Sequence, residues 1–462
     1  MQEDRKFYNP NKLVDVSKEI AIKFRNIIND TNYRFVYNSV VGAIVNIENW
    51  IDETKINKII SNIPYKEKLL VKTLLLGEDI DYNEATKLFG NEGIEFLERT
   101  NMFSACGENL MCNGYILLPV NELYLIVSLP SNYKHAKSRF SDIYIGQDSM
   151  RLQQMLSNRT FDSVLDLCSG SGVQGLHYGR YANSICAVEL NNNALTAASL
   201  NAKLNGYDNY KIFHGDLYSA LTEITQFDCI ISNPPYVPVP KDIEVAMCGD
   251  GGEDGMDIAK KIIDGYPTYL RQGGIGYMVL ECIGDEEKPF ILDYYQQVLQ
   301  RGEINVSIIS KSTLLSQADA SARLICGEDS ESYPLYLKKW LSVFKKLGAT
   351  SIYSVVIEYK KNSVDWTENI VRNYYKFPFN KSIEFLSGVS VKSAIKEYFD
   401  IYHDGFKVFS VRKDLFERIE HYRGKQVLDI LDEDFEQDKD SVNQINEMMN
   451  TIDVFASYGL LV

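Results

Sequence analysis

A short apolar stretch that runs into a glycine-rich turn constrains the fold of this chain most strongly. Residues 164–167 have the composition of a buried strand, and CSGSG (168–172) and helix-compatible sequence follow them. Glycine lets the backbone turn sharply and approach a ligand, and the start of a helix presents free N–H groups. A second strand, 184–188, ends in Glu189, about twenty residues beyond the glycines, where a carboxylate can bind both hydroxyls of a ribose. The order predicts an α/β fold with a nucleoside pocket.

A second motif, NPPY at residues 233–236, follows a strand-like stretch at 227–232. The Asn233 side-chain oxygen can accept a hydrogen bond from a substrate N–H, and the Pro234 carbonyl can accept another. The Tyr236 ring can stack on a flat amide or nucleobase. Asn-Pro is also ordinary turn chemistry, so the motif alone is equally typical of a turn that closes a strand. In sequence with the glycine loop and Glu189, it favours a site for a planar NH2 group whose lone pair faces an electrophile.

Taken together, residues 163–281 resemble a class I methyltransferase that uses S-adenosyl-L-methionine (SAM). They resemble more narrowly the branch that methylates planar nitrogens and includes the release-factor glutamine methyltransferases. The matching segments are 166–172, 187–189, 201–206, 214–216 and 233–236, and the run GGEDGMD (251–257) is typical of the glutamine branch. The resemblance implies a Rossmann-like core of seven strands, SAM as cofactor and S-adenosyl-L-homocysteine as product.

The same resemblance implies site residues. The expected catalytic residues are Asn233, Pro234, Pro235 and Tyr236. The expected cofactor-binding residues are Asp166, Cys168, Ser169, Gly170, Gly172, Glu189, Leu190, Gly215, Asp216, Leu217 and Asn233. Asp216 would lie near the adenine amino group, or it could serve as a helix N-cap. No metal is expected, because the cofactor itself carries the reactive methyl group.

The net charge of the chain indicates which class of methyl acceptor is favoured. The 462 residues carry a formal net charge of −15, whereas proteins that grip phosphate backbones usually show a basic patch. This favours a protein, peptide or small-metabolite acceptor over nucleic acid. An RNA or DNA base amino-group methyltransferase stays as the alternative, and so does a binding module without activity. The chain has no run of eighteen apolar residues and no apolar signal core at its start, so we expect a cytoplasmic protein with no membrane partner.

The length suggests two or three domains. We expect a substrate-recognition domain at 1–140, the methyltransferase at 141–362 and a small α+β accessory domain at 363–462. Helical spacing at 12–30 and 51–75, short helices at 83–89 and 93–99, and strands at 109–119 and 123–128 make the first domain winged-helix-like. Such a unit can be a substrate platform or can bind DNA.

Two connecting segments could shape the pocket. Residues 142–152 contain Tyr144, Gly146 and Ser149, which we expect beside the cofactor or substrate, although a linker with a serine helix cap fits equally. About forty residues separate a sixth strand (304–309) from a seventh (351–359), with a helix at 334–347. This insertion is either a specificity element or padding.

In the C-terminal part we expect helices at 391–401, 412–422 and 441–456 and a strand at 405–411. Its acidic run, 432–440, is either a solvated segment or a surface for a basic partner. The eight scattered cysteines are expected to be reduced thiols.

Overall fold

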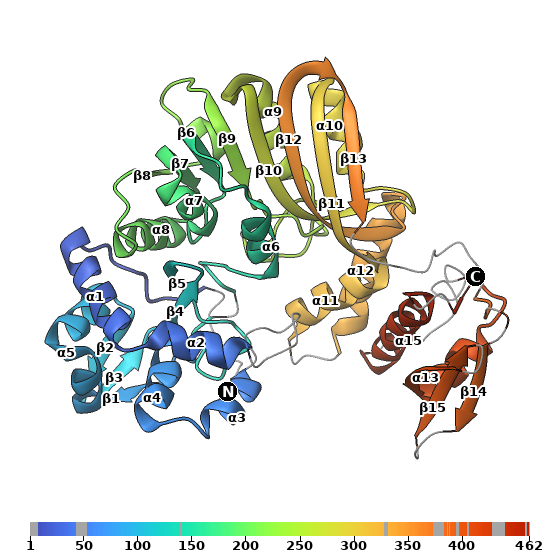
Figure 1. Cartoon of the computed structure of the whole chain (residues 1–462), viewed down its shortest axis with the longest axis horizontal. Coiled ribbons are helices and arrows are strands. Elements are labelled where there is room, and N and C mark those ends of the chain that lie inside the picture. The colour runs from blue at the N-terminus through green and yellow to red at the C-terminus, as the bar shows by residue number, and fades with distance from the viewer. Residues whose placement is uncertain are drawn as a thin grey trace.

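The structure, a computed structural model, describes residues 8–42, 53–138, 140–327, 331–372, 383–385, 387, 389–393, 397–403, 406–426, 439–457 and 460–461. Its centre is an eight-stranded sheet in the order β13-β11-β12-β10-β9-β6-β7-β8 (Figure 1). The strands are β6 (Phe161–Leu167), β7 (Ala182–Glu189), β8 (Tyr210–His214), β9 (Phe227–Ser232), β10 (Leu270–Gly284), β11 (Arg301–Thr313), β12 (Ser351–Asp365) and β13 (Thr367–Arg372).

The five strands from β6 to β10 run parallel, so their carboxyl ends meet at one edge of the sheet. Strand β12 is antiparallel to both β10 and β11. The connecting helices are α7 (Val173–His177), α8 (Asn192–Leu204), α9 (Asp257–Tyr269) and α10 (Ile291–Leu299). Strand β6 lies between β7 and β9, and its residues Val164, Leu165 and Leu167 are fully buried, as expected where helices cover both faces of a sheet. The predicted α/β core is confirmed.

The strand count differs from the prediction of seven. Strand β13 adds an eighth, pairing in parallel with β11 from Glu303 opposite Thr367 to Ile308 opposite Arg372. The expected boundary at 362/363 falls inside β12, and β13, which lies beyond that boundary, pairs within the central sheet. Strand β13 is at the edge of the sheet and mostly exposed, so its composition lacks the apolar signal of a central strand.

The N-terminal part contains helices and two small antiparallel sheets. The helices are α1 (Lys18–Asp30), α2 (Tyr33–Gly42), α3 (Glu53–Ile60), α4 (Tyr65–Leu74) and α5 (Tyr82–Arg99). The strands are β1 (Ile80–Asp81), β2 (Phe103–Cys106), β3 (Asn109–Cys112), β4 (Tyr115–Val120) and β5 (Leu123–Ser128). Strands β1, β3 and β2 form one sheet, and β4 and β5 form a hairpin.

Local backbone features explain where these elements break. Helix α5 has a non-helical residue at Gly90 (φ 65°, ψ 175°), so the two short helices expected there are both present. Helix α1 begins after the N-cap Ser17, whose side chain accepts from the Ile20 amide, so residues 12–17 are not helical. The single strand expected at 109–119 is wrong, because the chain turns at Gly114 (φ 91°) between β3 and β4.

Asn201 of α8 and Asn205, the C-cap residue of that helix, join the N-terminal part to the core. The Asn201 amide pairs with the backbone of Ile126 (2.7 and 3.2 Å), and Asn205 pairs in the same way with Tyr124 (2.9 and 2.8 Å). The two side chains thus occupy the free edge of β5 much as a neighbouring strand would. Asn201 also donates to the Ser171 carbonyl (2.9 Å), which links the hairpin to the glycine loop.

The insertion between β11 and β12 forms two helices, α11 (Leu314–Cys326) and α12 (Tyr333–Lys346). Only α12 was expected from the sequence, and Pro334 lies in its first turn as predicted. The two helices lie below the sheet, between the core and the C-terminal part (Figure 1).

The described residues of the C-terminal part include the strands β14 (Val389–Ser393), β15 (Tyr398–His403) and β16 (Phe406–Arg412) and the helices α13 (Lys413–His421) and α15 (Lys439–Ser457). The helix expected at 391–401 is wrong, because β14 and β15 pair antiparallel there and bury Ile401 in the local core. The strand expected at 405–411 is confirmed from Phe406, and so are the helices near 412–422 and 441–456. The acidic run at 432–440 lies outside the described residues except for Lys439 and Asp440.

All eight cysteines are free thiols, and Cys112, Cys229, Cys282 and Cys326 are buried. Among the described residues, no helix combines the length and apolar composition needed to cross a membrane.

Candidate active site

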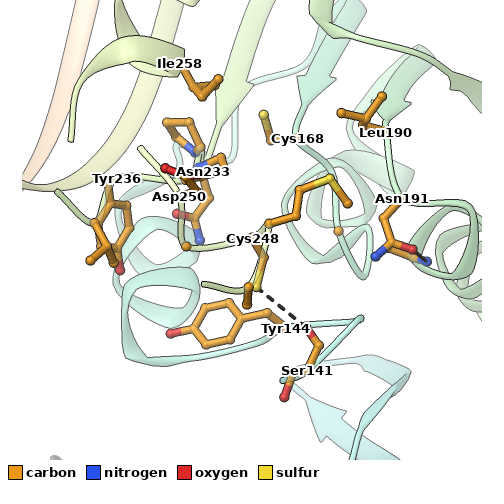
Figure 2. A pocket seen from close by; sticks show the side chains of 18 of the residues that line it. Ser141, Tyr144, Cys168, Leu190, Asn191, Asn233, Tyr236, Cys248, Asp250 and Ile258 are labelled. Atoms are coloured by element: carbon orange, nitrogen blue, oxygen red, sulfur yellow. Dashed lines mark hydrogen bonds between the residues drawn. The ribbon is translucent and has the colours of Figure 1, made fainter. Parts of the chain in front are cut away.

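A cavity of about 620 Å³ lies at the carboxyl ends of β6 to β9 (Figure 2). Most of the predicted site residues line it: Tyr144, Ser149, Cys168, Ser169, Gly170, Glu189, Leu190, Gly215, Asp216, Leu217, Asn233, Pro234, Pro235 and Tyr236. Three do not, namely Gly146, Asp166 and Gly172. In Figure 2, Cys168, Leu190 and Asn191 lie toward one side of the cavity, and Asn233 and Tyr236 lie toward the other.

The glycine loop after β6 has a backbone that few side chains tolerate. Gly170 (φ 54°) and Gly172 (φ 80°) are left-handed, and a Cβ at Gly172 would lie 2.8 Å from the Tyr210 hydroxyl. Three buried polar atoms of side chains that line the cavity have no hydrogen-bond partner among the described residues: Ser169 Oγ, Ser171 Oγ and Gln174 Oε1. Buried polar atoms are normally satisfied, so this open, polar cradle fits a polar ligand such as the methionine part of SAM.

Glu189 closes the far side of that loop. Its carboxylate accepts from the Gly170 amide (2.7 Å) and from the Asn191 amide (2.8 Å). Burial raises the pKa of Glu189, and these backbone donors oppose the shift. Each carboxylate oxygen has more than one acceptor site, so the fixed carboxylate can still accept from ligand hydroxyls.

Asp166 supports the loop from behind. It is fully buried, accepts from the Gly175 amide (2.8 Å), and burial raises its pKa to about 7. The expected direct contact with cofactor is therefore not what the geometry favours, because Asp166 lies outside the cavity wall.

Asp216 takes the N-cap position of a short 3₁₀ helix, Leu217–Ala220, but its side chain makes no capping hydrogen bond. Asp216 is instead one of the residues that line the cavity. Leu190 and Leu217 line the same cavity, so apolar side chains accompany Asp216, which can accept a hydrogen bond. That combination suits a flat ring that carries an amino group.

Asn233 is held by α6 (Gln147–Met155). Its amide nitrogen donates to Asp148 Oδ2 (2.8 Å) and to Ser149 Oγ (3.2 Å). Asp148 is only 6% exposed, and its other oxygen accepts from the Tyr144 hydroxyl (3.0 Å). Because the nitrogen is engaged, the Asn233 carbonyl oxygen is the atom that can accept from a ligand. Sequence reasoning missed Asp148, since an acidic residue in the first turn of a helix is ordinary.

Gly146 acts through packing. A Cβ there would lie 1.9 Å from the Tyr144 hydroxyl, so only glycine lets the Tyr144 ring fold over the start of α6. The Gly146 amide donates to Ser149 Oγ (3.4 Å), which makes Ser149 a helix-start cap as well as a cavity residue. The pKa of Tyr144 is raised, first by burial and then by Asp148, so its hydroxyl stays protonated.

The glycine run 251–257 packs directly on the NPPY loop. Val237 exchanges backbone hydrogen bonds with Gly249 (2.8 Å) and Gly251 (3.0 Å). A Cβ at Gly251 would lie 2.7 Å from the Tyr236 Cα, and one at Gly255 would lie 2.5 Å from the Tyr236 carbonyl oxygen. The two motifs therefore work as one unit, in which small residues let a second loop fix the backbone of the first.

Comparisons with known proteins match the part of the chain that contains the glycine loop and the NPPY motif. The family described as "Methyltransferase small domain" matches residues 132–287. A relative from Methanocaldococcus jannaschii, provisionally named a protein N5-glutamine methyltransferase, is 31% identical over 147 residues, which are 31% of this chain and 73% of that protein.

Two further relatives match over shorter shares. The release factor glutamine methyltransferase of Thermodesulfovibrio yellowstonii is 34% identical over 27% of this chain and 48% of its own. The ribosomal protein uL3 glutamine methyltransferase of Burkholderia pseudomallei is 37% identical over 27% and 45%. The chain thus spans less than half the length of these two relatives. A solved ribosomal protein L11 methylase from Lactobacillus delbrueckii subsp. bulgaricus, at 19% identity, covers 36% of this chain and 71% of its own with a TM-score of 0.25, too slight a likeness to carry an argument.

The sheet, the glycine loop and the matched region define a class I methyltransferase that depends on SAM. Within that class, the chain belongs to the N5-glutamine methyltransferase family. The predicted fold class, enzyme class and cofactor are confirmed.

Proposed function

We propose that the protein methylates the side-chain amide nitrogen of a glutamine in a polypeptide. One observation carries the proposal: the Asn233 nitrogen is committed to Asp148 and Ser149, which leaves its carbonyl oxygen to accept from an N–H of the acceptor. The relatives named for release factors and ribosomal protein uL3 supply the class of acceptor.

On the cofactor side, the chain would hold SAM with backbone and carboxylates. When bound, SAM supplies an electrophilic methyl group. The loop at 168–172 would receive the methionine part, and Glu189 would accept from the ribose hydroxyls. Asp216 would accept from the adenine amino group, with Leu190 and Leu217 beside the ring.

On the acceptor side, Asn233 and Pro234 would each accept one N–H of the glutamine amide, while Tyr236 would flank the amide plane. This arrangement orients the nitrogen and stabilises the positive charge that develops on it as it is methylated. A neutral asparagine suits a neutral acceptor. Asp148 would act as a positioning residue, because it holds the Asn233 amide in one orientation.

The other parts of the chain fit a protein acceptor. The N-terminal part, docked on α8 through Asn201 and Asn205, would be the substrate platform, and the net charge of −15 disfavours a phosphate backbone. The methyltransferase domain would extend to Arg372, the end of β13, with the accessory domain beyond it.

The test is methylation of peptides by the full chain under single-turnover conditions, read by mass spectrometry. Peptides with a central glutamine are compared with matched peptides that carry glutamate or asparagine. We expect one methyl group on the glutamine nitrogen alone. Methyl transfer to RNA or DNA bases but to no glutamine peptide would contradict the proposal.

A further inference from the structure

The insertion between β11 and β12 lines the cavity as well, in addition to the glycine loop and the segment that carries NPPY. Ser321, Leu324 and Ile325 of α11 and Trp340 of α12 all line the cavity, and none of these four side chains carries a charge. Trp340 also donates from its indole nitrogen to the Pro238 carbonyl (2.7 Å), two residues beyond the NPPY motif. The insertion therefore touches both the cavity and the loop that would hold the acceptor.

Leu324 is the notable member of this group. It is 54% exposed, although its neighbours Ala322 and Cys326 on α11 are buried. Val245, Ala246 and Met247, from the segment after the NPPY motif, line the same cavity, and Met247 is 42% exposed. Apolar side chains from two separate segments thus line the same cavity as Asn233, where a bound ligand could cover them.

Helix α11 also forms hydrogen bonds with helix α15 of the C-terminal part. Arg323 of α11 donates to Asn443 Oδ1 (2.9 Å) and to the Lys439 carbonyl (3.0 Å), both on α15. Ser316 donates to Asn446 Oδ1 (2.9 Å) on the same helix. The C-terminal part therefore holds α11 in place, as a specificity wall requires.

We propose that the insertion forms a subsite for an apolar, uncharged side chain that flanks the acceptor glutamine in the polypeptide. This inference rests on the proposed function, and it adds which polypeptides the enzyme selects. A leucine or similar side chain would cover Leu324 and Ile325 and lose apolar surface to water. A carboxylate or ammonium group would lose hydration against a wall whose four insertion side chains offer no opposite charge.

The experiment uses the full chain and a set of peptides with one central glutamine and a varied neighbour. The positions on either side carry leucine, serine, aspartate or lysine in turn, and kcat/KM is measured for each. We expect the leucine peptide at the preferred position to exceed the aspartate peptide by about tenfold or more. Leu324→Asp should lower kcat/KM for the leucine peptide and raise it for the lysine peptide, with the affinity for SAM unchanged.

Leu335→Asp is the matched control, because Leu335 is 56% exposed on α12 and lies outside the cavity wall. Leu324→Ser is a milder second variant that removes the apolar surface without adding a charge, and it should lower the leucine preference alone. Equal rates for all neighbours, with Leu324→Asp and Leu324→Ser like the wild type, would overturn the inference and leave the proposed function standing. Methylation of no glutamine peptide would overturn both.

Discussion

The two walls of the cavity are built in different ways. The cofactor wall comes from one stretch of chain, residues 168–217, in which the backbone N–H groups of Gly170 and Asn191 anchor the Glu189 carboxylate. The acceptor wall is assembled from distant segments: Asp148 fixes Asn233, the run 251–257 fixes the NPPY backbone, and Trp340 contacts Pro238. On this assignment, SAM would be held by a local sequence motif, whereas the acceptor would be held by residues that only the tertiary structure brings together.

Removing the central acceptor group should have the largest effect. Asn233→Ala is expected to lower kcat by about 10²–10³-fold, because it removes the hydrogen bond that stabilises charge on the reacting nitrogen. Turnover of a glutamine peptide at saturating SAM measures it. Full turnover by this variant would contradict the catalytic assignment.

On the cofactor wall, Glu189→Ala should weaken SAM binding by about 10- to 100-fold, since hydrogen bonds to a charged group are lost. At saturating SAM its kcat should stay close to that of the wild type. The KM for SAM in the peptide assay tests this, and a variant with an unchanged KM for SAM would show that Glu189 does not hold the cofactor.

Asp148→Asn tests whether Asp148 acts by orienting the Asn233 amide and not by contacting the cofactor. It should lower kcat by roughly tenfold, because an amide NH2 replaces one of the two oxygens that accept from Asn233 and Tyr144, and the orientation of the Asn233 amide is then less firmly fixed. The KM for SAM should not move. Asp162→Asn is the matched control, since Asp162 is exposed and pairs with Asn183 far from the cavity wall. If both variants matched the wild type in kcat, the positioning role would be wrong.

The smallest effect is expected from a substitution that weakens the link between the N-terminal part and the cofactor wall. Asn201→Ala removes hydrogen bonds to Ile126 and Ser171, so it should lower the free energy of unfolding by about 1–3 kcal/mol. The affinity for SAM should fall only a few-fold, because the loop keeps its own glycine geometry. Urea unfolding and SAM titration measure the two quantities. A loss of SAM affinity as large as that of Glu189→Ala would show that the wall is not local.

The sequence predicts the local motifs of the cavity better than the residues that only the tertiary structure brings to it. The loop 168–172, Glu189 and NPPY are local signals, and the structure brings them to one cavity as expected. Asp148 and Trp340 contact residues far away in the chain, and Leu324 meets the other lining residues only in the folded cavity, so no spacing marks these three. Strand β13 and the strands at 389–403 escaped prediction because pairing with neighbouring strands, and not composition, decides their conformation.

We infer that one cavity is divided between a cofactor wall that depends on Glu189 and an acceptor wall that depends on Asn233. Calorimetric titration of the wild type, Glu189→Ala and Asn233→Ala with SAM and with S-adenosyl-L-homocysteine tests it most directly. We predict saturable binding of both ligands by the wild type, nearly equal affinity in Asn233→Ala and clearly weaker binding in Glu189→Ala. Absence of binding by the folded wild type, or an equal loss in both variants, would contradict the claim.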